Sequence, residues 1–143
     1  EDRFRDLTAR LKEATGKLDV TSEIAAAADI TILSGDDGLT LPICSVGGKG
    51  VISVLANMLP SEVRRLTDLI AANDLAGATA QHLKLFSLFK GIFVETNPIP
   101  IKAAMAMAGL IRDELRLPMT PLSDKFRPGL AKLFEPFGLG QKK

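Results

Sequence analysis

Two short apolar runs separated by one helical stretch constrain the fold of this chain most. The runs are ITILSG at 30–35 and GVISV at 50–54; glycine closes the first and opens the second. Both runs are rich in β-branched residues, which is typical of strands buried within a sheet. The stretch between them, LTLPICSV at 39–46, fits a helix. The order strand–helix–strand predicts a parallel pair joined by a right-handed crossover.

The remainder of the chain predicts helices. After Pro60 the apolar residues recur at helical spacing, with a proline-rich connection at 115–123. Before the first strand, Asp19 or Thr21 is the expected N-cap of a helix. The expected helices are 1–11 (or a frayed lead-in), 22–29, 39–46, 61–74, 75–95, 99–110 and 124–139.

Size and charge limit the class of protein. A chain of 143 residues with 46% apolar residues matches one ordinary globular domain. A net charge of +1 gives no electrostatic basis for binding nucleic acid or an anionic membrane. The first residues contain no apolar signal core, and no stretch approaches 18 apolar residues. We therefore expect a soluble cytoplasmic protein, or one of the plastid stroma if the source is plant-like, with neither a membrane nor a nucleic-acid partner.

The cysteine and histidine counts restrict the chemistry. Cys44 is the only cysteine and His82 the only histidine, so an internal disulfide and a zinc site built from these residue types are both excluded. We expect neither a metal site nor a cofactor.

The glycine–lysine cluster VGGKG at 46–50 resembles a phosphate-binding loop only superficially. A P-loop requires glycine where this chain has Ile43, and serine or threonine where it has Gly50. A dinucleotide fingerprint opens a helix after a strand, whereas these glycines precede a strand. The cluster therefore predicts a helix C-cap and a tight turn into the second apolar run.

Five segments occur in the same order in one enzyme family: KEATGKLD at 12–19, SGDDGLTLP at 34–42, GGKGVISVLAN at 47–57, ETNPIPIK at 95–102 and LRLPMTPLS at 115–123. With them the chain resembles the C-terminal half of the 4-hydroxy-tetrahydrodipicolinate synthases (dihydrodipicolinate synthases), members of the N-acetylneuraminate lyase superfamily of pyruvate-dependent class I aldolases. The resemblance extends from residue 12 to about 138. The Asp-Asp pair after Gly35 and the NPIPIK segment favour this family over its relatives.

The resemblance implies a lyase of lysine (diaminopimelate) biosynthesis that condenses pyruvate with aspartate-β-semialdehyde and needs no cofactor. Lys12 is then the catalytic amine that forms a Schiff base with pyruvate, and the backbone of Gly35 and Ile52 lies beside the bound pyruvate. Gly35 and Ile52 also come at the carboxyl ends of the two expected strands, where (β/α)₈ barrels carry their chemistry.

The resemblance also implies an α/β fold: the C-terminal portion of a (β/α)₈ barrel with two or three parallel strands, followed by a helical segment. Residues 1–59 would supply partial barrel units, and 60–143 the last barrel helix and the C-terminal helices. A complete barrel needs about 250 residues. The family's proton-relay tyrosines and its carboxylate-binding hydroxyls would lie in the missing part, and this chain contains no tyrosine. We therefore expect the isolated chain to be inactive.

An incomplete barrel exposes sheet edges, which invite pairing with another chain. We therefore expect a homo-oligomer or a complex with a complementary half-barrel chain. Two alternatives to the synthase stay open: a non-catalytic module for interaction or oligomerisation, and another pyruvate-dependent aldolase of the superfamily.

The position of Lys12 is also open. Thr8 and Arg10 stand where the family has an apolar and a small residue. A strand buried on both faces would not carry Arg5, Asp6 and Arg10 so close together. Lys12 then lies either on a buried strand as a reactive amine or on a helix or loop facing water. Asp36 and Asp37 fit helix caps and substrate contacts equally well.

Overall fold

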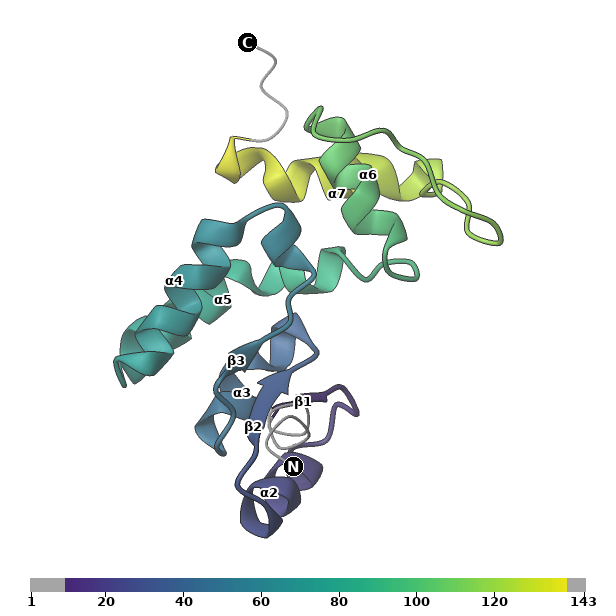
Figure 1. Cartoon of the computed structure of the whole chain (residues 1–143). Coiled ribbons are helices and arrows are strands. Elements are labelled where there is room, and N and C mark those ends of the chain that lie inside the picture. The colour runs from purple at the N-terminus through teal and green to yellow at the C-terminus, as the bar shows by residue number, and fades with distance from the viewer. Residues whose placement is uncertain (1–9, 139–143) are drawn as a thin grey trace.

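The computed structural model describes residues 10–138 and contains three strands and six α-helices in an α/β arrangement (Figure 1). The strands with α2 and α3 form one end of the molecule, α6 and α7 form the other, and α4 and α5 lie between them (Figure 1). The elements are β1 (Arg10–Glu13), α2 (Leu18–Ala27), β2 (Thr31–Ser34), the 3₁₀ turn η1 (Asp37–Leu39), α3 (Thr40–Ser45), β3 (Gly50–Val51), η2 (Leu55–Asn57), α4 (Pro60–Ala71), α5 (Leu75–Gly91), α6 (Ile99–Met107), η3 (Asp124–Phe126), α7 (Arg127–Phe134) and η4 (Glu135–Phe137).

The three strands form a parallel sheet in the order β1-β2-β3. The predicted parallel pair is β2 and β3, joined through α3, and its parallel pairing is confirmed. The third strand, β1, pairs with β2 along its whole length, with Lys12 opposite Leu33 and Glu13 opposite Ser34. The expected strand at 50–54 is shorter than predicted, because β3 ends at Val51.

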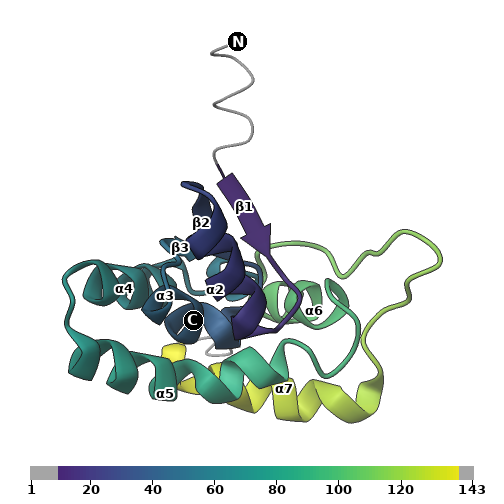
Figure 2. The same ribbon diagram turned by 90° about the horizontal axis from the view of Figure 1, so that it is seen from below.

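The two faces of the sheet differ. Glu13, Ile32 and Ser34 are buried on one face, which α3 covers through its contacts with β2 and β3. The other face carries exposed Arg10 and Lys12 and is left partly open. Figure 2 shows the strands on one side of the molecule, then α2 and α3, then α5 and α7.

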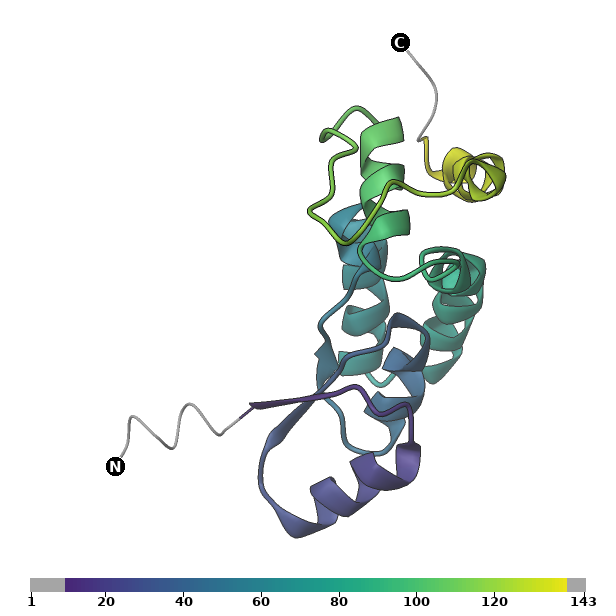
Figure 3. The ribbon, with the colours of Figure 1, turned by 90° about the vertical axis from the view of Figure 1, so that its right-hand side faces the viewer.

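The main hydrophobic core lies in the helical part of the chain. The pattern after Pro60 places Val63 and Leu66 on the buried face of α4, which packs against α5. The helix α5 contributes the fully buried Leu85, and α7 lies directly above α5 (Figure 3) and contacts it. The buried members of this core are Leu55, Met58, Val63, Leu66, Ala78, Leu85, Leu88, Phe89, Ile92, Ile99, Ile101, Ala103, Ala104, Leu122, Leu130 and Phe134.

Several local expectations change. Residues 10 and 11, expected at the end of a helix, lie in β1, and the rest of that expected segment is outside the described residues. Neither Asp19 nor Thr21 caps α2, since that helix begins after Lys17, whose side chain makes no capping hydrogen bond. Thr21 is instead buried within the helix.

The division of the chain at residue 59 into barrel units and a C-terminal region stays a prediction.

Among the described residues, no helix combines the length and the apolar character needed to cross a membrane.

Candidate functional site

The carboxyl ends of the three strands are joined by backbone hydrogen bonds that continue one step beyond the strands. Gly35, the residue after β2, donates its N–H to the carbonyl oxygen of Glu13 at 2.6 Å. Ile52, the residue after β3, donates its N–H to the carbonyl oxygen of Ser34 at 2.8 Å. Two of the residues predicted to contact pyruvate therefore lie on neighbouring strand ends, as the parallel order requires.

Lys12 lies on strand β1 and is exposed, so each of the two alternatives is wrong in part: the residue is not on a helix or loop, and its strand does not bury it. Its side chain is exposed and shares a face with its register partner Leu33, because side chains alternate along a strand. The neighbouring Glu13 faces the opposite, buried side. The amine therefore projects on the open face of the sheet.

Gly35 lies against the Lys12 side chain. A Cβ atom added at Gly35 would lie 2.8 Å from Lys12 Cε, and also 2.8 Å from the carbonyl oxygen of Glu13 and from the Cβ of Ala14. No real side chain fits at such distances, so the close approach of the two strand ends requires glycine. The structure thus brings Lys12 and Gly35 together, with Ile52 one strand further along.

Glu13 anchors the turn that follows Lys12. Its side chain is 2% exposed, and its Oε1 accepts a hydrogen bond from the backbone N–H of Thr15 at 2.6 Å and another from the Thr15 hydroxyl. Its Oε2 is buried and has no hydrogen-bond partner among residues 10–138. The sequence analysis assigned no role to Glu13, although an acid directly after Lys12 in the segment KEATGKLD is a signal that marks it.

The two aspartates after Gly35 have different environments. Asp36 is exposed, and its Oδ1 accepts a hydrogen bond from the N–H of Gly38 at 2.7 Å, as a cap of η1 does. Asp37 is 2% exposed, and its carboxylate accepts hydrogen bonds from the Ser53 hydroxyl and the Val54 N–H. Burial raises the pKa of the Asp37 carboxyl, and these hydrogen bonds act in the opposite direction.

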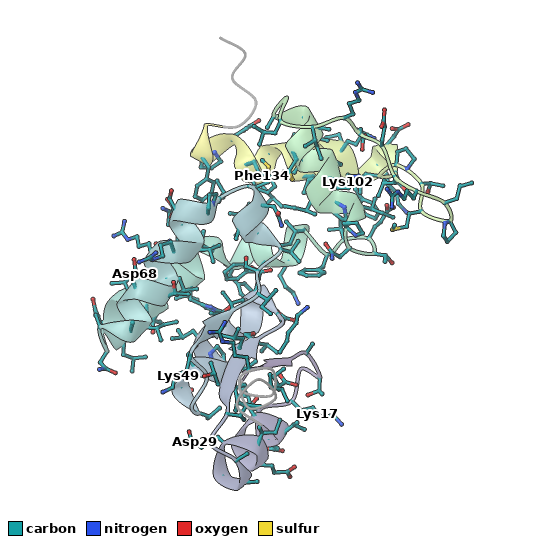
Figure 4. All side chains as sticks on the ribbon, viewed as in Figure 1. Lys17, Asp29, Lys49, Asp68, Lys102 and Phe134 are labelled. Carbon is teal, nitrogen blue, oxygen red and sulfur yellow. The ribbon has the colours of Figure 1, made fainter. Side chains whose placement is uncertain are left out.

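The glycine–lysine cluster serves the turn from α3 into β3, as predicted. Gly47 has φ +114°, which only glycine adopts without strain, and the N–H groups of Gly48 and Lys49 bond the carbonyl oxygens of Ile43 and Ile32. Lys49 lies at the outer flank of the strand region (Figure 4). A cavity of about 360 Å³ beside the cluster lies at the amino end of β3, away from Lys12, and is lined by Cys44, Gly48, Lys49, Gly50, Thr67, Ile70, Ala71 and Asn73.

Across the part of the chain that the structure describes, no three His, Cys, Asp or Glu side chains gather in a way that could hold a metal ion.

Comparison with known proteins agrees with this geometry. Residues 7–136 match the model of the dihydrodipicolinate synthetase family. The chain is 43% identical to the 4-hydroxy-tetrahydrodipicolinate synthase of Pelobacter propionicus over 136 residues, which are 94% of this chain and 47% of that protein. It is 47% identical over 129 residues to the enzyme of the same name from Methanococcus maripaludis strain S2, covering 90% of this chain and 45% of that protein.

Two solved structures match the fold of this chain over a similar share of its length. The dihydrodipicolinate synthase of Aquifex aeolicus superposes with a TM-score of 0.89 at 40% identity, over 94% of this chain and 47% of that one. The enzyme of Thermotoga maritima gives a TM-score of 0.87 at 36% identity, over 92% of this chain and 46% of that one.

The chain spans about half the length of the curated relatives it matches. These shares measure how much of each relative is matched and not which part, so the assignment to the C-terminal half stays a prediction. The match to the family model and the identities above 40% place the whole described fold in one family: the chain belongs to the dihydrodipicolinate synthetase family.

Proposed function

We propose that this chain is part of a pyruvate-dependent lyase that condenses pyruvate with aspartate-β-semialdehyde through an imine on Lys12. The observation that carries the proposal is the contact between Lys12 and Gly35 at the carboxyl ends of the strands, where the side chain of Lys12 lies against a backbone that only glycine permits. The names of the relatives support the same reaction class.

The chemistry needs little beyond a positioned amine. The neutral Lys12 amine adds to the keto carbon of pyruvate, and loss of water leaves a protonated imine. This group withdraws electrons, so a base can remove a proton from the pyruvate methyl group. The resulting enamine then attacks the aldehyde carbon, and a carbon–carbon bond forms.

The backbone at Gly35 and Ile52 suits this intermediate. Both N–H groups are already engaged, with Glu13 and Ser34 respectively. A backbone contact of these two residues with a ligand would therefore come from their carbonyl oxygens, since a carbonyl oxygen accepts hydrogen bonds and favours a nearby positive charge. A protonated imine on Lys12 is such a charge, which gives the strand ends a role in stabilising it.

Reductive trapping tests the proposal. Treating the chain with pyruvate and borohydride is expected to attach a reduced pyruvate to Lys12, detected by peptide mass spectrometry, and Lys12→Ala is expected to abolish this adduct. Lys17→Ala is the matched control, since Lys17 is an exposed lysine in the turn after β1 (Figure 4) and should leave the labelling unchanged. Labelling that spreads evenly over several lysines, or does not occur, would contradict the proposal.

Complete turnover is a stricter requirement than trapping. Positioned general acid–base groups contribute about 10²–10⁴ in rate, and the chain has no tyrosine to serve as a proton relay. We therefore propose that the isolated chain labels slowly and shows no measurable synthase turnover. The same trapping samples, assayed with aspartate-β-semialdehyde, check this.

A second candidate function is that of an association module, favoured by the partly open face and the free edge of the sheet at β1. Unpaired strand edges are stabilised by pairing with another chain. We expect light scattering at micromolar concentration to report a homo-oligomer, or a complex once a complementary half-barrel chain is added. A single monomeric species in both samples would exclude this candidate.

A further inference from the structure

Asp37 is a buried carboxylate without a cationic partner. It begins η1, directly after the capping residue Asp36, and is only 2% exposed. None of the ion pairs found among residues 10–138 includes it. Burying a carboxylate without a compensating positive charge is costly, and stability alone would be served as well by a neutral residue.

Within residues 10–138, the hydrogen bonds of the Asp37 carboxylate lead to the chain that follows β3. Its Oδ2 accepts from the Val54 N–H at 2.9 Å, and its Oδ1 accepts from the Ser53 hydroxyl. The Ser53 oxygen in turn accepts from the Ala56 N–H at 2.9 Å, so its single proton is free to point at Asp37. One carboxylate therefore fixes the two residues that come directly after Ile52.

The segment that carries Asp37 is itself held at the end of β2. The Ser34 hydroxyl donates to the carbonyl oxygen of Asp36 at 2.7 Å, and the Thr40 hydroxyl donates to the carbonyl oxygen of Asp37 at 2.9 Å. Gly35 lies inside this segment, and Ile52 is bonded to Ser34. The loops after β2 and β3 are thus joined at two points, by the backbone bond of Ile52 and by the Asp37 side chain.

We propose that Asp37 is a positioning residue that holds the loop after β3 against the loop after β2, so that the backbone of Gly35 and Ile52 stays aligned beside Lys12. It acts through Ser53 and Val54, which separate it from the reacting atoms. Its role in pyruvate binding rests on the proposed function; its role in holding the two loops does not.

The first test measures the loops directly. In Asp37→Ala we expect the backbone amides of Ile52 and Val54 to exchange with deuterium about tenfold faster or more. The Val54 N–H loses its acceptor, and the Ile52 N–H, which donates to Ser34, lies in the loop that the carboxylate holds. Asp74→Ala is the control: Asp74 caps α5 through the Gly77 N–H at 2.9 Å, so the variant loses a similar carboxylate–backbone bond outside the loops after β2 and β3. Unchanged exchange at Ile52 and Val54 in Asp37→Ala, or equal acceleration in both variants, would overturn the proposal.

The second test measures the consequence for pyruvate. The pyruvate concentration that half-saturates the trapping of Lys12 should rise about tenfold in Asp37→Ala and remain unchanged in Asp74→Ala. Asp37→Asn should restore a value close to that of the parent. The amide oxygen of the new side chain can accept a hydrogen bond from the Val54 N–H, and its NH₂ group can donate to the second lone pair of the Ser53 oxygen. If Asp37→Ala acted only through a general loss of stability, this recovery would not be expected.

The outcomes of the two tests are separable. If the parent chain is not labelled at all, the proposed function fails, and the exchange experiment alone decides the positioning role. If the parent is labelled and Asp37→Ala has the same half-saturating concentration, the positioning role in pyruvate binding is refuted while the proposed function stands.

Discussion

Replacing Leu85 by alanine is expected to lower the free energy of unfolding by about 2–5 kcal/mol. Leu85 is 0% exposed on α5, within the hydrophobic core that α4, α5, α6 and α7 share. The loss combines the transfer free energy of the deleted carbons with the cost of the cavity they leave. Because domains of this size are stable by about 5–15 kcal/mol, the substitution removes a large fraction of the total.

Urea denaturation followed by circular dichroism measures this loss, and Leu83→Ala is the matched control. Leu83 lies on the same helix, two residues earlier, and is 65% exposed, so its truncation should change the unfolding free energy by less than about 0.5 kcal/mol. Equal effects of the two substitutions would mean that the buried face of α5 is not the one described.

Replacing Gly35 by alanine is expected to damage both the sheet and the labelling of Lys12. The new Cβ would lie 2.8 Å from the carbonyl oxygen of Glu13, and backbone atoms cannot swing away as a flexible side chain does. The strand ends must separate, at a cost of roughly 1–3 kcal/mol. The same atom would displace Lys12 Cε, so imine trapping should slow by roughly 10- to 100-fold.

Gly129→Ala is the control for this substitution. Gly129 lies in α7, and a Cβ added there meets no atom within 4 Å. Alanine should therefore stabilise the chain by about 0.4–1 kcal/mol, because it restricts the unfolded chain and favours the helix. Thermal unfolding of both variants would show shifts of opposite sign, and a shift of the same sign would contradict the role assigned to Gly35.

The predictable part of the fold is the part with long, regular patterns. The helical spacing of Val63 and Leu66 predicted α4, and the β-branched run at 30–35 predicted β2. The second run, at 50–54, predicted a strand of five residues, whereas β3 has two residues. The strand ends at Val51 because the chain beyond it is bound to Asp37 and turns into η2. A contact with a residue 17 positions away leaves no signal in a local pattern.

Lys12 shows why the site was harder to predict. The charges at Arg5, Asp6 and Arg10 argued against a buried strand only on the assumption that both faces of the sheet are buried. Among residues 10–138, β1 is an edge strand with one partly open face, and there charged side chains and strand geometry are compatible. The sequence shows which residues are charged, but it does not show whether a strand has neighbouring strands on both sides. That depends on the whole fold.

The two aspartates were indistinguishable in sequence for a related reason. Asp36 and Asp37 have the same side chain and adjacent positions, and both suit the start of a short helix. Their directions differ because η1 turns one carboxylate to solvent and the other towards the loop after β3. The residue types predicted that an acid would act as a cap or a contact at this position. Only the backbone geometry shows that Asp36 is the cap and that Asp37 is the buried acceptor.

The hydrophobic core begins, among its buried members, only at Leu55, after the last strand. The residues that would carry the chemistry, Lys12, Gly35 and Ile52, all precede it. Substitutions at the buried positions of the helices would therefore act mainly on how long the protein persists in a cell, and could leave the strand ends unchanged. Substitutions at Gly35 would act on persistence and on recognition together, because one close approach both closes the sheet and places Lys12.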